Sequence, residues 1–304
     1  MSNKLYRIYV GAICNRDLEI FQEIKKFCSK NYNISIVNLF KSGSDKFNVK
    51  YFKKRLKKYP ISLIIVKLYS EASNQIIYDA LNLYAPNIPV LNSLNSVKIC
   101  ESRKNTIQFI NQKCKKLYTP QIYPTFNEAY EACKNGKNII IKIDTHNVPS
   151  LPKNDRILGI AENLDQFEKL TAEFKNSNLF FQEYIGEFDL VYKIYVIDRW
   201  VGSITSHNRL QERNDLSPLD LIHMRAPVEK QFKRRVLRLG RKLGMAIFGI
   251  DYIITNDGIR YIVDVNDFPS FRSIPEAVSL ISDYIYNILF VRGQTYKASV
   301  KVHG

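Results

Sequence analysis

The sequence predicts an α/β protein whose N-terminal part is a parallel sheet with helices between its strands. Short apolar runs rich in Ile and Val alternate with helical segments over residues 4–91, which is the order of elements in a parallel sheet. Of the 304 residues, 45% are hydrophobic and 12% aromatic, so the chain can bury a sizeable core in two or three subdomains. Near the C-terminal end, two apolar runs flank an Asp-Gly pair, which indicates a β-hairpin.

The N-terminal part follows a regular order of strand and helix. Strands are expected at 4–11, 33–40, 61–66 and 89–91, and helices at 17–30, 44–59 and 71–85. In the first helix, Leu18, Phe21, Ile24 and Phe27 lie on one side, as in a helix that covers a sheet. Residues 92–95 mark a turn into the next segment.

The remaining elements mix helices with shorter strands. Strands are expected at 138–143, 157–161, 179–185, 191–197 and 200–205, and helices at 101–116, 127–135, 165–175, 228–243 and 275–290. Residues 118–124 contain two prolines and are expected to form an extended connector. No run approaches the roughly 18 apolar residues that a membrane helix needs.

The hairpin at residues 248–269 carries the clearest chemical signal. Asp251 lies in its first strand, and Asp264 and Asn266 lie in its second. A turn at Asn256-Asp257 brings Asp251 close to Asp264, and Asp264 and Asn266 share one face because they are two residues apart. Two carboxylates and an amide oxygen are hard ligands that suit Mg²⁺. A surface hairpin with solvated acids is the alternative, although an unpaired Asp264 in an apolar strand would be costly.

The net charge of +16 creates an attractive field for anions. Nucleic acid, an anionic membrane and a polyphosphorylated small molecule all fit this charge. Basic clusters lie at 46–58 and 230–242, and the second has an apolar helical face formed by Val228, Phe232, Val236, Leu239 and Leu243. It is expected to be an amphipathic core helix with a solvated basic side. Nucleic acid is the less favoured partner, because no zinc-finger, RNP or helix-turn-helix pattern accompanies the charge.

The five cysteines are scattered and form no CxxC pair. Reduced thiols of a cytosolic protein explain them best, and a zinc site is not expected. The N-terminal residues lack the apolar core of a signal peptide. We therefore expect a cytoplasmic protein without a membrane partner.

Several polar residues stand at strand ends, where a ligand can reach them. Lys142 follows three isoleucines, and its ammonium can meet a phosphate there, although a snorkelling edge lysine is the alternative. Residues 182–185 end an apolar strand and can offer backbone groups to a flat heterocycle. Lys193 lies within an apolar strand and needs a partner or an anionic ligand. His146, in a loop, would alone be an ordinary solvated residue. Further basic residues at strand ends or in loops are Lys67, His207, Arg209, Arg213, Arg225 and Arg272.

Taken in order, these features resemble the ATP-grasp superfamily over about residues 60–290. Within it, the chain is most similar to inositol 1,3,4-trisphosphate 5/6-kinases. The segments that match are Ile64 to Lys67, Tyr192 to Ile194, Phe248 to Asp251 and Asp264 to Pro269. Peptide ligases of the superfamily usually have Glu at the position of Asp264, which favours the kinases.

The resemblance implies an ATP-grasp fold with ATP and Mg²⁺ as cofactors. It divides the chain into an N-terminal parallel α/β subdomain at 1–95, a central ATP-grasp subdomain at 96–185 and a C-terminal subdomain with the metal site at 186–304. The last two would be α+β subdomains that clamp the nucleotide.

The resemblance also assigns roles to single residues. The metal ligands fall on Asp251, Asp264 and Asn266. The nucleotide contacts fall on Lys142, on the hinge residues Gln182, Glu183, Tyr184 and Ile185, and on Arg103 or Lys104. The catalytic and substrate-side residues fall on Lys67, His146 and Lys193, with His207, Arg209 and Arg272 as further substrate contacts.

Three departures from the family pattern lie on the substrate side. Asn147 stands where the family usually has Gly after the histidine, and Ser270 stands where it has Gly after Phe-Pro. Ser206 stands near a position where the family has Arg, and His207 and Arg209 are the nearby residues that could replace this arginine. These positions bear on the acceptor and not on ATP or Mg²⁺.

The resemblance therefore implies a kinase that transfers the γ-phosphate of ATP to an inositol phosphate. A carboxylate–amine ligase of the same superfamily, similar to RimK and acting through an acylphosphate, is the alternative. A nucleic-acid binder without enzymatic activity is the third hypothesis.

Overall fold

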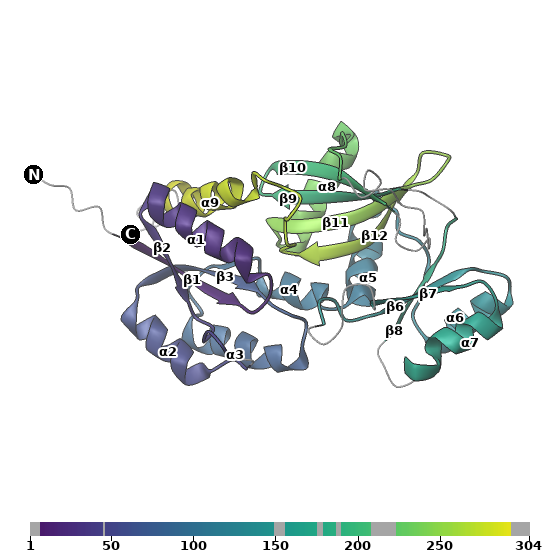
Figure 1. Ribbon diagram of the computed structural model, residues 1–304, viewed down its shortest axis with the longest axis horizontal. Helices are drawn as coiled ribbons and strands as arrows, with labels where there is room; N and C mark the ends of the chain where they lie inside the picture. Colours follow the sequence, from purple (N-terminus) through teal and green to yellow (C-terminus); the bar gives the residue numbers. More distant parts are fainter. Residues whose placement is uncertain are drawn as a thin grey trace, which may run out of the picture. The chain divides into compact units, whose positions relative to one another are not determined.

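The computed structural model describes residues 7–44, 46–148, 156–174, 179–186, 190–207 and 223–292. These residues form two compact units (Figure 1). Unit 1 takes in the described residues up to Leu94 and those from Phe268 onward, and unit 2 is Asn95–Asp267. The division into three subdomains stays a prediction.

Unit 1 contains a four-stranded sheet with the order β2-β1-β3-β4, and all its strand pairs are parallel. Its strands are β1 (Ile8–Cys14), β2 (Ile34–Asn38), β3 (Ile61–Lys67) and β4 (Val90–Leu91). Its helices are α1 (Leu18–Tyr32), α2 (Val49–Lys58), η1 (Ala72–Asn74), α3 (Gln75–Tyr84), α4 (Leu94–Cys100, shared with unit 2), α9 (Ala277–Asn287) and the π-helical turn η4 (Ile288–Arg292). The predicted parallel order of strands and helices is confirmed.

Unit 2 contains two four-stranded antiparallel sheets, β5-β8-β6-β7 and β10-β9-β11-β12. The first comprises β5 (Ile122–Tyr123), β6 (Ile139–Ile143), β7 (Ile157–Ala161) and β8 (Leu179–Glu183). The second, here called the hairpin sheet, comprises β9 (Leu190–Ile197), β10 (Trp200–His207), β11 (Ile247–Ile254) and β12 (Arg260–Asp267). The helices are α5 (Arg103–Lys113), α6 (Phe126–Lys134), α7 (Leu164–Thr171), η3 (Ala172–Phe174) and α8 (Lys230–Leu243).

The predicted hairpin is present as β11 and β12. Gly258 has a φ of 80°, which a glycine adopts without steric cost, and its N–H donates to Thr255 O at 2.8 Å. The register pairs Asp251 with Asp264 and Gly249 with Asn266. The two carboxylates therefore face each other across the strands, as predicted.

The hairpin sheet has an apolar face and a polar face. Ile250 and Val265 pair in register and belong to one buried cluster with Val236 and Leu239 of α8. Because side chains alternate along a strand, the neighbouring residues Asp251 and Asp264 point to the opposite face. The same alternation in β9 sends Ile194 into the cluster and Lys193 to the face of the carboxylates.

Several predicted boundaries are wrong, and local caps explain two of them. The helix predicted from residue 44 begins at Val49, because the Asn48 side chain accepts a hydrogen bond from Tyr51 N at 2.9 Å. The helix predicted at 101–116 is α5, and Ser102 caps it by accepting from Asn105 N. Helix α4, where a turn was expected, and the short strand β5 within the connector were missed. Within the described residues, no helix is long and apolar enough to span a membrane.

Candidate active site

The site is centred on Asp251 and Asp264, which are both partly buried on the polar face of the hairpin sheet. Lys193 Nζ lies 3.7 Å from Asp251 Oδ2, so the lysine in the apolar strand has the partner that its position requires. Burial raises the pKa of Asp251, and the charge of Lys193 opposes this effect. Asn266 is half-buried two residues after Asp264, on the same face.

His146 and Arg103 approach Asp264 from outside the hairpin sheet. His146 Nε2 lies 2.9 Å from Asp264 Oδ1, and Arg103 Nε lies 3.8 Å from Oδ2. Burial acts to raise the pKa of Asp264, but the charges of His146, Arg103 and Lys142 outweigh burial and hold this pKa below its ordinary range. His146 is fully enclosed, and burial lowers its pKa. The histidine is therefore a buried partner of a carboxylate and not a solvated loop residue.

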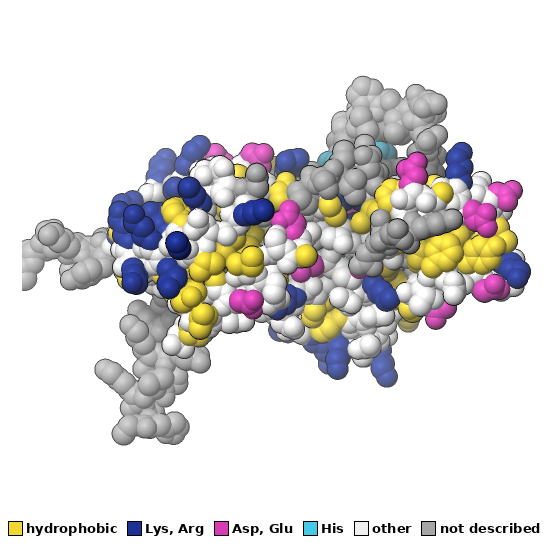
Figure 2. Space-filling model, turned by 90° about the horizontal axis from the view of Figure 1, so that it is seen from below, with side chains coloured by type: hydrophobic (Ala, Val, Ile, Leu, Met, Phe, Trp, Pro, Cys, Tyr) yellow, Lys and Arg dark blue, Asp and Glu magenta, His cyan; other side chains and the backbone are white. Residues whose placement is uncertain are grey.

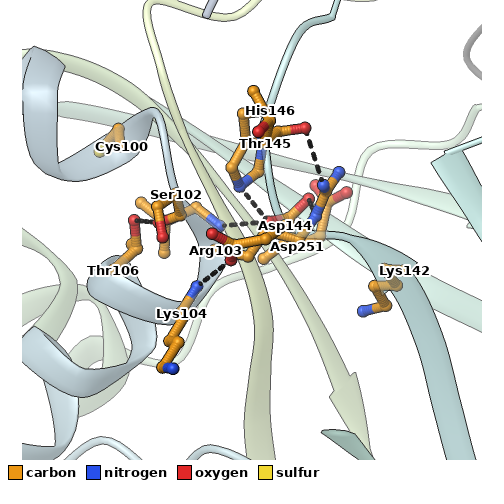
Figure 3. A network of polar contacts seen from close by, with 12 residues as sticks. Cys100, Ser102, Arg103, Lys104, Thr106, Lys142, Asp144, Thr145, His146 and Asp251 are labelled. Carbon is orange, nitrogen blue, oxygen red and sulfur yellow. Dashed lines mark hydrogen bonds and ion pairs between the residues drawn. The ribbon is translucent and has the colours of Figure 1, made fainter. Parts of the chain in front are cut away.

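The structure separates the two candidates Arg103 and Lys104. Arg103 is buried, and its Nη1 donates to the carbonyls of Ile143 and Thr145. The side chain of Lys104 points away from Asp251, and its Nζ donates to Pro124 O at 2.7 Å (Figure 3). Of the two, Arg103 is the residue that lies beside the carboxylates.

Asp144 holds Arg103 in place, and the sequence analysis missed it. The Asp144 carbonyl accepts from Arg103 N at 3.0 Å, and its Oδ1 accepts from Lys104 N at 2.7 Å. An acid at the N-terminus of α5 satisfies an amide that has no partner within the helix and interacts favourably with the helix dipole. The sequence signal was an acid directly after the apolar strand at 138–143 in a basic chain.

Lys142 lies on β6 and is buried, with 6% of its surface exposed. Its Nζ donates to Gln182 Oε1 on the neighbouring strand β8 at 3.1 Å. Burial lowers the pKa of Lys142 from 10.5 to about 8, while the carboxylate of Asp264 opposes this effect. The lysine is thus enclosed, and not a snorkelling edge residue.

The predicted hinge follows directly from β8. Glu183 forms an ion pair with Lys137 at 2.9 Å, and its N–H donates to Gln121 O at 2.8 Å. The N–H of Tyr184 donates to Asn138 O at 2.7 Å. Hydrogen bonds to neighbouring segments therefore hold the backbone of residues 183–184. Ile185 is the next residue in the chain.

Some predicted substrate residues lie in unit 1. Lys67 ends β3 and is fully buried, with its Nζ 3.2 Å from Asp17 Oδ2. The same ammonium donates to the carbonyls of Phe268 and Pro269. Arg272 is exposed, and its Nη2 lies 3.6 Å from Asp17 Oδ1. Asp17, which the sequence analysis missed, is the acid that both cations share.

The backbone around Lys67 is strained at three places. Asp17, Phe268 and Phe271 have φ values of 45°, 41° and 56°, which non-glycine residues rarely adopt. Strain of this kind gathers at functional sites. The Lys67 ammonium, through Asp17 and the Phe268 carbonyl, contacts two of the three strained residues.

The remaining predicted residues are less informative. His207 ends β10 and is half-buried, opposite Leu190 of β9. Arg225 is exposed, and its guanidinium lies 6.0 Å from the centre of the Trp200 ring. Arg209 and Arg213 lie outside the described residues.

Asn147, a departure from the family pattern, adopts a φ of 48°. This left-handed conformation is the one for which glycine is best suited, and asparagine tolerates it better than most residues. The replacement of Gly by Asn after the histidine is therefore compatible with the same backbone turn.

The donors at the site fit a metal ion and an anionic ligand. Within the described residues, no cluster of three or more His, Cys, Asp or Glu side chains could hold a metal. The site instead offers two carboxylates, Asp251 and Asp264, and the amide oxygen of Asn266. This set of oxygen donors is suited to Mg²⁺. Among the same residues, the buried donors Gln182 Nε2 and Arg103 Nε have no hydrogen-bond acceptor. A phosphorylated heterocycle would offer acceptors to such donors.

Solved structures of similar fold include ligases and an ATP-grasp protein with a RimK domain. D-alanine–D-alanine ligase from Bacillus anthracis, complexed with ATP, has a TM-score of 0.65 and 14% identity, with 95% of this chain and 99% of that chain covered. The RimK domain protein ATP-grasp from Sphaerobacter thermophilus has a TM-score of 0.62 and 13% identity, covering 91% of this chain and 98% of that one. An ATP-grasp ligase associated with ribosomal peptide products from Chryseobacterium gregarium, in complex with ADP and a leader and core peptide, has a TM-score of 0.64 and 14% identity, covering 94% and 97%.

A family model narrows the comparison for one segment of the chain. The model of the inositol 1,3,4-trisphosphate 5/6-kinase ATP-grasp domain matches residues 198–287, which include both carboxylates of the site. The resemblance predicted from the sequence is confirmed. The chain therefore has the fold of the ATP-grasp superfamily, and its segment 198–287 is similar to the ATP-grasp domain of inositol 1,3,4-trisphosphate 5/6-kinases.

Proposed function

We propose that this chain is an Mg²⁺- and ATP-dependent kinase that phosphorylates an inositol phosphate in the cytoplasm. The observation that carries the proposal is the facing pair of Asp251 and Asp264, with Lys193, His146 and Arg103 within 4 Å of the two carboxylates. The match of the inositol kinase model to the segment that contains this pair supports the acceptor class. Phosphoryl transfer requires positioning and charge neutralisation more than covalent chemistry, and this group of side chains supplies both.

Asp251, Asp264 and Asn266 would hold the metal. Bound Mg²⁺ neutralises charge on phosphate oxygens. Within the described residues, the partners Lys193, His146 and Arg103 restrain the two carboxylates, so little ordering remains when a cation binds.

Lys142 and Arg103 would bind the nucleotide phosphates, and Gln182 to Ile185 would bind the adenine. The lowered pKa of Lys142 is consistent with a buried ammonium that would gain from an anionic partner. Because the N–H groups of Glu183 and Tyr184 already donate to Gln121 and Asn138, we assign the adenine contacts to the hinge carbonyls and to Ile185.

In unit 2, His146 and Lys193 would bind the phosphates of the acceptor, with His207 and Arg209 as further contacts. In unit 1, Lys67 and Arg272 are the proposed substrate residues. His146 and Lys193 each approach one of the two carboxylates, at 2.9 Å and 3.7 Å. A substrate phosphate near these residues would therefore lie close to the proposed metal site, as transfer requires.

The decisive experiment measures ADP formation with Mg²⁺-ATP and a panel of inositol phosphates, with the products resolved by phosphorus NMR. A new phosphomonoester on the inositol ring supports the proposal and identifies the hydroxyl. The Asp264→Asn variant should be inactive in the same assay, and the Asp257→Asn variant, changed at the exposed hairpin turn, should retain activity. A product with an unmodified inositol ring across the panel refutes the proposal.

A carboxylate–amine ligase is the second candidate, because the similar solved structures named above are ligases or a RimK domain protein. The two reactions differ in their products. A kinase leaves the phosphate on the acceptor, whereas a ligase releases inorganic phosphate together with ADP. Stoichiometric phosphate release that depends on an added carboxylate and an amine would decide for the ligase.

A further inference from the structure

A second feature of unit 2 is the exposed side of α8. Phe232, Val236, Leu239 and Leu243 are buried against the apolar face of the hairpin sheet. Arg234, Arg238 and Arg241 are exposed on the other side of the helix. From Arg234 to Arg241 the helix extends about 10 Å, so the three arginines form a stripe of that length.

The segment that follows α5 extends this stripe. Arg235 Nη1 donates to Lys116 O at 3.0 Å, and Lys242 Nζ donates to Lys113 O, so this segment lies against α8. Lys113, Lys115 and Lys116 are exposed. We call the six exposed residues Arg234, Arg238, Arg241, Lys113, Lys115 and Lys116 the α8 basic surface.

Acidic residues are absent from the two segments that form this surface. The sequence has no Asp or Glu between residues 102 and 127 or between 230 and 250. Among the described residues, Glu229 precedes α8 and forms an ion pair with Arg260 at 3.1 Å, and Asp198 N–H donates to Ala246 O just after α8. The surface therefore keeps a strong excess of positive charge.

The α8 basic surface cannot serve the proposed active site. Helix α8 packs on the face of the hairpin sheet that carries Ile250 and Val265, and Asp251 and Asp264 point to the other face. A sheet and a layer of buried side chains thus separate the two. A polyanionic acceptor bound near the carboxylates leaves the charge of α8 without a role.

We propose that the α8 basic surface binds the sugar–phosphate backbone of a double-stranded nucleic acid, without sequence preference. Three of its six residues are arginines, whose planar guanidinium pairs with phosphate in a bidentate way. A straight stripe of about 10 Å spans about three successive phosphates of one strand. Contacts to phosphate carry no sequence information, so this mode of binding has no sequence preference.

The composition of the surface distinguishes a duplex from other polyanions. Binding at a lipid surface gains from exposed aliphatic side chains beside the bases. Among the described residues, the large aliphatic side chains that are exposed, such as Leu83 and Leu190, lie in other segments. Single strands bind by stacking on rows of aromatic residues, and Tyr118 is the one exposed aromatic residue of the described α8 and α5 region.

The test uses the full chain and a fluorescein-labelled duplex of 20 base pairs, with affinity measured by anisotropy between 50 and 200 mM salt. The variant replaces Arg234, Arg238 and Arg241 with glutamine. The matched control replaces Lys50, Lys53 and Lys54 of α2 with glutamine, which removes the same charge from another exposed basic segment. Figure 2 shows that Lys and Arg side chains also gather elsewhere on the molecule, at the left of that view.

We expect the α8 variant to lose at least about tenfold in affinity at 100 mM salt. Its slope of log affinity against log salt should fall by about 2 to 3, because each phosphate contact contributes about 0.9. The α2 variant should change the affinity less than about twofold. ADP formation should be unchanged in both, since neither set of residues belongs to the proposed active site.

Three outcomes would overturn the proposal. Equal losses in both variants would mean that net charge alone attracts the duplex. Absence of wild-type binding at 50 mM salt would exclude a duplex partner. Vesicles with phosphatidylserine that displace the duplex and bind tighter, with the same dependence on α8, would assign the surface to a membrane. None of these results bears on the kinase, because ADP formation is measured separately.

Discussion

Replacement of Lys142 with methionine should stabilise the ligand-free protein and abolish nucleotide binding. The lysine is buried on β6, and burial lowers its pKa from 10.5 to about 8. At pH 7 the ammonium is charged in both the folded and the unfolded chain, so the folded state carries the penalty of the buried charge. A difference from 10.5 to about 8 corresponds to about 3 kcal/mol.

The net effect of Lys142→Met is smaller than this penalty. The variant loses the hydrogen bond to Gln182 Oε1, which costs about 1 kcal/mol. Methionine is flexible and fills the space of the lysine stem. We therefore expect a gain of about 2 kcal/mol in the free energy of unfolding at pH 7.

The gain should vanish at higher pH. Between pH 8 and 10.5 the folded wild-type chain has released the proton that the unfolded chain still binds, so wild-type stability rises with pH in that window. Near pH 9.5 the remaining penalty is about 1 kcal/mol, which the lost hydrogen bond offsets. The advantage of the variant should therefore be close to zero there.

Guanidinium unfolding at pH 7 and pH 9.5 measures both values, and the thermal shift with Mg²⁺-ATP measures nucleotide binding. Lys137→Met is the matched control, because Lys137 is exposed and forms an ion pair with Glu183. Its difference in stability from wild type should be the same at pH 7 and at pH 9.5. A destabilised Lys142→Met variant whose difference from wild type does not depend on pH would refute the burial argument.

Three further predictions test the rest of the site. Asp264→Asn should abolish turnover, while circular dichroism stays unchanged. Asp257→Asn at the exposed turn is the control, and full activity of the Asp264→Asn variant would refute the metal assignment. His146→Ala should raise the KM for the inositol phosphate about tenfold and leave the KM for ATP unchanged, because His146 is proposed to bind the acceptor. A change in the KM for ATP alone would assign His146 to the nucleotide. Gly258→Ala should cost about 1 kcal/mol in unfolding, because its φ is 80° and no atom lies within 4 Å of the added Cβ; a larger cost would mean that the change disturbs more than the turn.

The hairpin could be predicted because its signals are local. Apolar alternation and the Asp257-Gly258 pair lie within 20 residues of each other, and they determine both the turn and the opposition of Asp251 and Asp264. The parallel order of unit 1 was predictable for a similar reason, since each strand and helix has its own period.

The surroundings of the basic side chains Arg103, Lys104 and Lys67 could not be predicted, because they depend on contacts between distant segments. Arg103 and Lys104 are neighbours in sequence, and the choice between them follows from bonds to residues 143–145, about 40 positions away. The partners of Lys67 include the carbonyls of Phe268 and Pro269, about 200 residues further along the chain. No periodicity in the sequence specifies such pairs.

The alternation of the hairpin strands links the site to the core. If β12 were paired one residue out of register, Asp264 would point toward α8 and Val265 would point toward Lys193 and His146. An unpaired carboxylate would then lie among Val236 and Leu239, at a cost of several kcal/mol, and a valine would lose its burial. The apolar cluster therefore selects the same register that brings the two carboxylates together. The opposition of Asp251 and Asp264 needs no specification beyond the one that folds the sheet, and for this reason it could be predicted from the sequence.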